Sequence, residues 1–273
     1  MEYSYQNKIV IDGNTIGYDK PCYIIAEIGI NHNGNIVLAK KLIDVAVGAG
    51  ANAVKFQKRD LESIYQQEIL KTPSLDSQGT EILIDVLKNV EFSEGDFQDI
   101  VNYCKEKKIT FLCTPWDIPS VNFLEKLDVP AYKIASADLT NFPLIAHISK
   151  LNKPIIISTG MSEMEEIERT VYFVKEKNVV FSLLHCNSTY PSPPELLNLS
   201  LILVLREKFN VPIGYSGHES SILPSITAAN MGAVIIERHI TLDKTMEGLD
   251  QAASLDPDEF KELIQKVRES EIA

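Results

Sequence analysis

The sequence predicts a (β/α)8 TIM barrel with a short N-terminal β-hairpin, and three observations support this fold. Eight short apolar segments alternate strictly with eight amphipathic segments of helix length. Such alternation is typical of a parallel sheet, and eight units in 273 residues favour a closed barrel over an open, doubly wound sheet. No GxGxxG motif follows the first strand, so a dinucleotide-binding fold loses its best support.

The N-terminal region carries a hairpin pattern. Within residues 8–20, two short apolar segments flank Asp12-Gly13-Asn14, which is a turn signal between strands. We therefore expect a hairpin appendage over residues 1–20 and one catalytic barrel domain over residues 21–273.

The expected strands are short, mainly apolar runs, and the helices between them carry an apolar stripe. The strands are expected at 22–28, 52–56, 109–113, 131–135, 154–158, 180–186, 212–216 and 233–237. The helices are expected at 36–49, 81–107, 118–128, 141–151, 162–177, 195–209, 219–231 and 256–270. We expect the second helix to break near Glu91–Gly95. Segment 57–76 is long for a connection between strand and helix, and we expect it to form a lid.

The composition excludes several classes of protein. The net charge of -12 argues against non-specific binding to nucleic acid or to an acidic membrane surface. The N-terminus has no apolar signal-peptide core, and no apolar run approaches the roughly 20 residues needed to cross a bilayer. The four cysteines are far apart and form no CxxC pair, which fits reduced thiols. We expect a cytoplasmic protein that contacts neither nucleic acid nor membrane.

Every expected strand ends in polar residues. Because the carboxyl ends of all eight strands meet at one face of a barrel, where barrel enzymes carry their active sites, this pattern indicates a catalytic site. A barrel with a purely structural role would not need it. The candidate residues at these ends are Glu27, Lys55, Gln57, Thr114, Lys133, Ser136, Asp138, Ser158, Ser188, Tyr190, Ser216, His218, Glu237 and His239.

Two lysines are expected inside the barrel. Side chains two residues apart share one face of a strand, so Lys55 and Gln57 point inward together. A buried lysine is costly unless it meets an anion, so Lys55 and Lys133 indicate a phosphate or carboxylate ligand. The alternative is an internal ion pair, such as Lys55 with Glu27, and both interpretations can hold in the empty enzyme.

Two histidines follow neighbouring strands. Adjacent strands lie about 4.8 Å apart, so His218 and His239 can share one ion such as Zn, Mn or Fe, with positions left for water and substrate. A hydrogen-bonded structural role is the alternative on spacing alone. Lys58 and Arg59 are expected to form a solvated pair, with a lid role over a phosphate as the alternative. Trp116 is expected to pack under the site.

The strand-end motifs resemble the sialic acid synthase family, also called N-acetylneuraminate synthases, with the related legionaminic acid and spore-coat polysaccharide synthases. The matching segments cover almost the whole chain in order. They are IAEIGINHNGN (25–35), AVKFQKR (53–59), CTPWD (113–117), YKIASADLTNFPLI (132–145), ISTGMS (157–162), LLHCNSTYP (183–191), IGYSGH (213–218), IIERHIT (235–241) and ASLDPDEF (253–260).

The resemblance implies a metal-dependent condensation of phosphoenolpyruvate with the open-chain aldehyde of an N-acylated hexosamine such as N-acetylmannosamine, giving a nonulosonic acid and phosphate. The implied catalytic residues are Glu27, Lys55, Lys133, His218 and His239. The implied phosphoenolpyruvate contacts are Lys55, Thr114, Lys133, Ser136, Ser188 and Ser216. The implied sugar contacts are Gln57, Asp138, Tyr190 and Asp250. His218 and His239 would hold a divalent metal, Mn first, with Mg, Co or Zn as alternatives.

The sequence departs from the family pattern at three places. Position 138 is Asp where many members have Glu, and residues 247–252 lack the usual basic character after Asp250. Full-length members carry a C-terminal antifreeze-like domain that covers the partner's barrel in a homodimer and supplies an arginine to the sugar. These 273 residues do not include that domain. We therefore expect them to bind phosphoenolpyruvate but to turn over poorly, and a homodimer remains the expected assembly.

Three other functions compete with this interpretation. A Schiff-base aldolase or lyase would use Lys133 or Lys55 as a desolvated amine. A synthase that condenses phosphoenolpyruvate with a phosphorylated sugar, as in the 3-deoxy-octulosonate-phosphate type, would need a further basic site, for which Lys58 and Arg59 are the candidates. A non-catalytic binding barrel is the third alternative, and polar groups on all eight strand ends argue against it.

Overall fold

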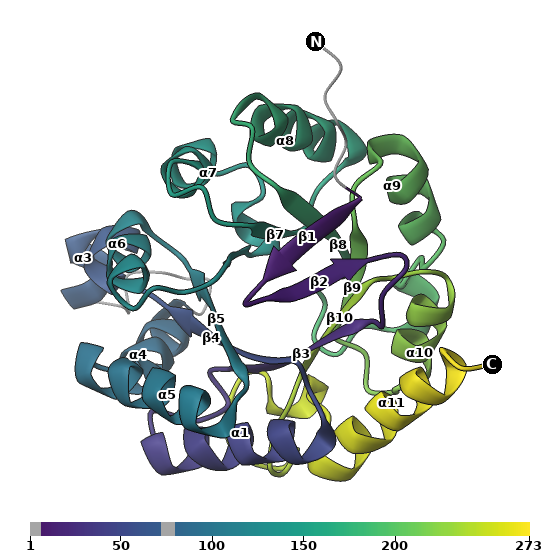
Figure 1. Ribbon diagram of the computed structural model, residues 1–273. Coiled ribbons are helices and arrows are strands. Elements are labelled where there is room, and N and C mark those ends of the chain that lie inside the picture. Colours follow the sequence, from purple (N-terminus) through teal and green to yellow (C-terminus); the bar gives the residue numbers. More distant parts are fainter. Residues whose placement is uncertain (1–6, 72–79) are drawn as a thin grey trace.

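The computed structural model describes residues 7–71 and 80–273, and its core is a closed barrel of eight parallel strands ringed by helices (Figure 1). The strands follow one another around the barrel in chain order, and the last pairs with the first. They are β3 (Tyr23–Gly29), β4 (Ala53–Lys58), β5 (Thr110–Pro115), β6 (Tyr132–Ile134), β7 (Ile155–Ser158), β8 (Phe181–Cys186), β9 (Ile213–Gly217) and β10 (Ile235–His239). Each lies within two residues of the predicted range at either end, so the predicted barrel is confirmed.

Helices separate the strands as predicted. They are α1 (Ile36–Ala49), α2 (Leu61–Ile64), α3 (Gln67–Lys71), α4 (Thr80–Val90), α5 (Glu94–Lys107), α6 (Ile118–Lys126), α7 (Phe142–Ser149), α8 (Met164–Glu176), α9 (Leu201–Phe209), α10 (Leu223–Asn230) and α11 (Pro257–Ser270). The predicted break in 81–107 is present, because Ser93 starts α5 with a capping box to Asp96. In the described part of the chain, no helix has the length and apolar character needed to span a bilayer.

The expected lid segment, 57–76, contains the two short helices α2 and α3. Residues 72–76 of that segment lie outside the described residues. Its role as a lid therefore stays a prediction.

The N-terminal hairpin closes one end of the barrel. Strands β1 (Lys8–Ile11) and β2 (Asn14–Gly17) pair antiparallel and lie across the ring of strands (Figure 1). The hairpin side chains Ile9, Ile11 and Ile16 are buried in one cluster with inward residues of the barrel such as Ile25 and Ile156. The hairpin is thus part of the barrel's core and seals the end opposite the carboxyl ends of the strands.

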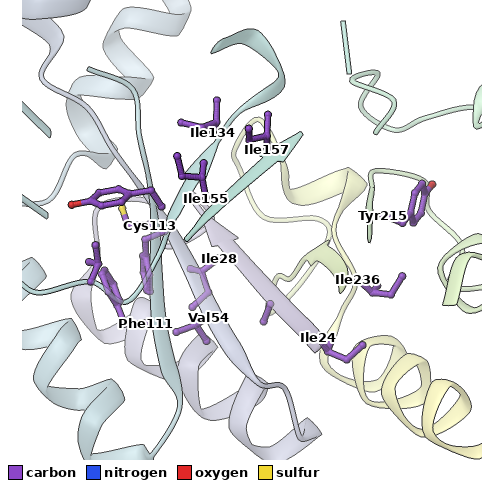
Figure 2. Close-up of a cluster of buried hydrophobic side chains, with 14 of the residues drawn as sticks. Ile24, Ile28, Val54, Phe111, Cys113, Ile134, Ile155, Ile157, Tyr215 and Ile236 are labelled. Atoms are coloured by element: carbon purple, nitrogen blue, oxygen red, sulfur yellow. The ribbon is translucent and has the colours of Figure 1, made fainter. Parts of the chain in front are cut away.

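Alternate residues of each strand pack into two different hydrophobic clusters. On β3, Ile24 and Ile28 pack outward into the large cluster between strands and helices, part of which is drawn in Figure 2. Tyr23 and Ile25 point inward to the hairpin cluster. Because the period is two, the next inward residue is Glu27, which lies near the carboxyl end of the strand. Apolar residues therefore fill the lower barrel, and charged residues occupy its upper mouth.

One ion pair is buried in the outer layer and makes a testable contribution to stability. Arg238 is fully buried, and its Nη1 lies 2.9 Å from Oε1 of Glu219. Replacing Glu219 with Ala leaves this guanidinium without its carboxylate, so we expect the free energy of unfolding to fall by roughly 3–5 kcal/mol. Urea denaturation measures this change. The control is Glu168→Ala, which removes a surface partner of Lys208 and should cost less than about 1 kcal/mol. Equal losses for the two variants would contradict the prediction.

Candidate active site

A cavity of about 210 Å³ opens at the carboxyl ends of the strands. All the predicted site residues line it except Asp138 and Asp250. The lining consists of Glu27, Lys55, Gln57, Thr114, Trp116, Lys133, Ala135, Ser136, Ala137, Ser158, Met161, Cys186, Ser188, Tyr190, Ser216, His218, Glu237 and His239. Side chains that are far apart in the sequence meet here because parallel strands end at one face.

Two lysines and two glutamates form a buried charge network in this cavity. Lys55 Nζ lies 2.7 Å from Glu27 Oε2 and 3.8 Å from Glu237 Oε1. Lys133 Nζ lies 3.8 Å from the same Glu237 oxygen and donates a hydrogen bond of 2.6 Å to Ser158. The predicted internal ion pair between Lys55 and Glu27 is therefore present. Without a ligand, the two cations are balanced by two carboxylates.

Burial and neighbouring charges set the protonation of this network. Burial raises the pKa of Glu27, and burial lowers the pKa of Lys133. Burial also opposes the charge on Lys55, but the adjacent Glu237 and Glu27 outweigh it and raise the pKa of that lysine. Lys55 is thus held as a cation by its carboxylate partners, and Lys133 is the more easily neutralised amine.

A bulge at the end of β3 sets the position of Glu27. The register between β3 and β4 shifts between Glu27 and Gly29, and Gly29 has a φ of 54°. A Cβ at this position would lie 3.2 Å from Glu27 and Gln57 and 3.3 Å from His239. Glycine is needed here both for its left-handed backbone and for the close approach of these side chains.

The predicted histidine pair is brought together. The ring centroids of His218 and His239 lie 5.5 Å apart. Nδ1 of His218 is 2.6 Å from the carbonyl oxygen of Asn187, which assigns the proton to Nδ1 and leaves a lone pair on Nε2. The hydroxyl of Tyr190 then donates to that Nε2 at 2.8 Å.

His239 has an unpartnered ring nitrogen. Its Nδ1 is buried and makes no hydrogen bond, and burial lowers the pKa of His239 to about 4, so the imidazole is neutral at pH 7. The carboxylate of Asp250 lies 3.8 Å from this Nδ1 and favours the proton there, which leaves the lone pair of the neutral imidazole on Nε2. Two neighbouring imidazoles that each offer an Nε2 lone pair are a donor set that suits a divalent transition metal. Within the residues that the structure describes, no group of three or more His, Cys, Asp or Glu side chains is arranged to hold a metal. The protein donors for an ion would thus be the two histidines.

Two of the four predicted sugar-binding residues, Gln57 and Tyr190, line this cavity, whereas Asp138 and Asp250 do not. Tyr190 stacks on His218 with ring centroids 4.0 Å apart, and Asp250 Oδ2 lies 3.8 Å from Nδ1 of His239. Gln57 donates to Glu27 at 3.0 Å. Asp138 is not among the residues that line this cavity and instead lines a neighbouring one.

The prediction of a solvated Lys58–Arg59 pair is wrong. Arg59 is only 8% exposed, and its guanidinium lies 4.5 Å from the ring centroid of Trp116. Lys58 and Arg59 both pair with Glu91, at 3.2 Å and 3.5 Å. The pair is buried by a tertiary contact, because the connection between α4 and α5 places Glu91 against the end of β4. Arg59 also donates to Gln57, so it belongs to the surroundings of the site.

Cys186 lines the cavity, although it is not among the predicted site residues. Its Sγ lies 3.5 Å from the Ser136 hydroxyl. The signal that would have placed it there is period two on β8, since Leu184 points inward and Cys186 follows two residues later. The intervening His185 points the other way, and its Nε2 lies 2.6 Å from the carbonyl oxygen of Leu197.

A closed parallel barrel with a charged cavity at the carboxyl ends of its strands defines the class of (β/α)8-barrel enzymes. The profile of the NeuB family matches residues 42–273, and the chain belongs to this family of transferase-type synthases.

Named relatives agree with this assignment. N-acetylneuraminate-9-phosphate synthase of Homo sapiens is 40% identical over 259 residues, which cover 94% of this chain and 72% of that protein. N,N'-diacetyllegionaminic acid synthase of Campylobacter jejuni is 38% identical, over 92% of this chain and 76% of that protein. The crystal structure of N-acetylneuraminic acid synthetase from Leptospira borgpetersenii, in complex with citrate, has a TM-score of 0.87 and 35% identity and covers 96% of this chain and 88% of that one.

Proposed function

We propose that the protein condenses phosphoenolpyruvate with the open-chain aldehyde of an N-acylated hexosamine and releases a nonulosonic acid and phosphate. One observation carries the proposal. Two buried lysines and several hydroxyl groups share a cavity with two histidines whose rings lie 5.5 Å apart. Such a cavity offers one region for an anion and another for a metal-polarised carbonyl. The relatives named as synthases of sialic and legionaminic acids support the same reaction.

Phosphoenolpyruvate would lie against Lys55 and Lys133. Thr114, which already accepts a hydrogen bond of 3.0 Å from Lys55, would complete one side. Ser136 and Ser188 would complete the other, across the space that the missing side chain of Gly160 leaves open. The hydroxyl of Ser216 would contribute as well, since it lines the same cavity. Charge-assisted hydrogen bonds of this kind are the strong ones for phosphate and carboxylate oxygens.

Two carboxylates complete this arrangement. Glu237 lies between the two lysines, and its carboxylate would offset the repulsion between their ammonium groups when no substrate is bound. Glu27, whose pKa is raised by burial, would direct the water that adds to the reacting carbon and exchange a proton with it. Gln57 would orient Glu27 through their hydrogen bond and contact the sugar.

His218 and His239 would hold a divalent ion, Mn first, with Mg, Co or Zn as alternatives. When bound, the ion supplies Lewis-acid polarisation of the aldehyde oxygen. Nε2 of His218 has one lone pair, so the Tyr190 hydroxyl would give up its present hydrogen bond and become available to the sugar. Asp250 would orient His239 from its position 3.8 Å away and contact the acceptor.

A Schiff-base aldolase is the second candidate, and one observation favours it. Burial lowers the pKa of Lys133, and a neutral buried amine is what imine formation requires. Treatment with borohydride and pyruvate distinguishes the two reactions, because only an imine is trapped as a covalent adduct on the lysine. We expect no adduct on Lys133 or Lys55.

The main test is phosphate release from phosphoenolpyruvate with Mn and a panel of N-acylated hexosamines that includes N-acetylmannosamine. We expect release that requires the sugar and stops when a chelator is added. Release that needs no metal, or a borohydride-trapped adduct, would contradict the proposal. If phosphoenolpyruvate binds in a calorimeter but no sugar supports release, then the acceptor is outside the panel or a domain beyond these residues is required.

A further inference from the structure

Arg59 is a buried arginine that directly follows β4. Only 8% of it is exposed, and the residues that line the active-site cavity include Gln57 and Glu27 but not Arg59. Burial of a guanidinium is costly unless partners replace the water that it loses. The identity of those partners therefore indicates what Arg59 does.

Glu91 holds Arg59 by both its side chain and its backbone. Oε1 of Glu91 lies 3.5 Å from Nη1 of Arg59, and Oε2 accepts a hydrogen bond of 3.2 Å from the backbone N–H of Arg59. Lys58 donates to the same Oε2 at 3.2 Å and to the carbonyl oxygen of Arg59 at 2.7 Å. The indole ring of Trp116 lies against the guanidinium, 4.5 Å away. These contacts fix the guanidinium in place and leave Nη2 to bond with Gln57.

The contact with Arg59 determines which end of the Gln57 amide faces Glu27. Nη2 of Arg59 donates to Oε1 of Gln57, and Nε2 of Gln57 donates to Oε1 of Glu27 at 3.0 Å. A guanidinium has donors only, whereas an amide has one acceptor oxygen and one donor nitrogen. The amide oxygen must therefore face Arg59, and the nitrogen must face Glu27. The last torsion of a glutamine side chain has no sharp preference of its own, so this orientation depends on the neighbours.

The carboxylate of Glu27 is held from two sides. Its Oε2 lies 2.7 Å from Nζ of Lys55, which is itself fixed by a hydrogen bond of 3.0 Å to Thr114. Its Oε1 accepts the hydrogen bond from Gln57. If Arg59 is removed, the Gln57 amide can rotate, and Glu27 then retains its contact with Lys55 but loses the fixed donor on its other oxygen.

We infer that Arg59 is a positioning residue for Glu27 that acts through Gln57, with Glu91 as its anchor. The inference rests on the proposed condensation, in which Glu27 directs the attacking water. A displacement of about 1 Å in a catalytic group can reduce a rate by about 10²-fold. We therefore expect Arg59→Met to lower kcat for phosphate release at least twentyfold. The Kd of phosphoenolpyruvate should stay within threefold of the wild-type value, because both lysines of the proposed anion site are unchanged.

A double-mutant cycle tests the path from Arg59 through Gln57. The phosphate assay gives kcat for Arg59→Met, for Gln57→Leu and for the double variant. If Arg59 acts through Gln57, adding Arg59→Met to Gln57→Leu lowers kcat by no more than a further twofold. An effect transmitted through Trp116, or through a general loss of structure, would persist in full in the Gln57→Leu background and would overturn the inference.

Arg59→Lys is a second variant in case the methionine variant does not fold. Lysine keeps a cation beside Glu91 but lacks the planar fork that also reaches Gln57. We expect it to lower kcat at least tenfold, and a wild-type kcat in this variant would show that the charge of Arg59 suffices without the hydrogen bond to Gln57.

Arg206→Met is the matched control, because Arg206 also lies against an aromatic ring, 4.0 Å from the ring centroid of Tyr18, and is not among the residues that line the active-site cavity. It should change kcat less than twofold. Thermal unfolding of each variant checks its fold.

Exchange of the Gln57 side-chain amide protons with water tests the inference without turnover. Nuclear magnetic resonance identifies these protons by their absence from Gln57→Leu. We expect their exchange to be at least tenfold faster in Arg59→Met than in wild type and unchanged in Arg206→Met. Equal exchange in Arg59→Met and wild type overturns this inference alone, whereas a wild-type protein that binds no phosphoenolpyruvate refutes the proposed function.

Discussion

Replacing Lys133 with Met is expected to weaken phosphoenolpyruvate binding at least a hundredfold and to reduce phosphate release below detection. Lys133 is 3% exposed, so its charge acts on a ligand with little screening by water. Removing one member of a buried charge pair costs about 3–5 kcal/mol, and 1.4 kcal/mol corresponds to a tenfold change in affinity. The variant also leaves Glu237 with Lys55 as its remaining lysine partner, so the cavity becomes net negative toward an anion.

Calorimetric titration with phosphoenolpyruvate measures the first effect, and the phosphate assay measures the second. Lys208→Met is the control, since Lys208 pairs with Glu168 on the surface and should keep wild-type affinity. Lys133→Gln serves as a second variant with a polar side chain in case the methionine variant is unstable. If a folded Lys133 variant binds phosphoenolpyruvate with a Kd within threefold of the wild-type value, Lys133 is not part of the anion site.

Removing the metal, or one of its proposed ligands, is expected to have the second large effect. Dialysis against a chelator should abolish phosphate release, and added Mn should restore it. His239→Ala should raise the Kd for Mn at least a hundredfold, because loss of an orienting group alone typically costs about 10–100-fold in metal affinity. Electron paramagnetic resonance of free Mn gives this Kd without depending on turnover.

His147→Ala is the matched control for the metal experiment. His147 lies on α7 and contacts Asn122 at 2.7 Å, outside the active-site cavity. We expect its Mn affinity and its activity to match those of wild type. Full activity of chelator-treated protein, or Mn binding in His239→Ala equal to that of the control, would show that the two histidines serve another purpose.

Most of the barrel could be predicted because its strands and helices depend on residues that lie close together in the sequence. Strand runs such as 180–186 and helix starts such as Ser93 follow from side-chain periodicity and capping, which act over a few residues. The inward direction of Lys55, Gln57, Glu237 and His239 follows in the same way, since one face of each strand must be apolar to pack on helices. These residues line the cavity as predicted.

Other features depended on contacts between distant segments. The sequence predicted a solvated Arg59, whereas in the structure Glu91 and Trp116, from two other parts of the chain, pack against its guanidinium. The second cavity that Asp138 lines is also formed by Ile64 and Ile118, which come from other segments of the chain. Because these contacts join residues far apart in the sequence, no local sequence pattern predicts them.

The sequence by itself determined the eight-fold alternation and the face that carries the polar residues, because both follow from the order and spacing of residues along the strands. It also carries the motifs through which the chain resembles its family. The tertiary structure alone decided that the hairpin closes the lower end of the barrel, that Lys55 is already paired with Glu27, and that a second, carboxylate-lined cavity lies beyond Trp116. The physical reason is that burial, distance and net charge within a cavity are properties of packed neighbours, and neighbours are set only when the chain has folded.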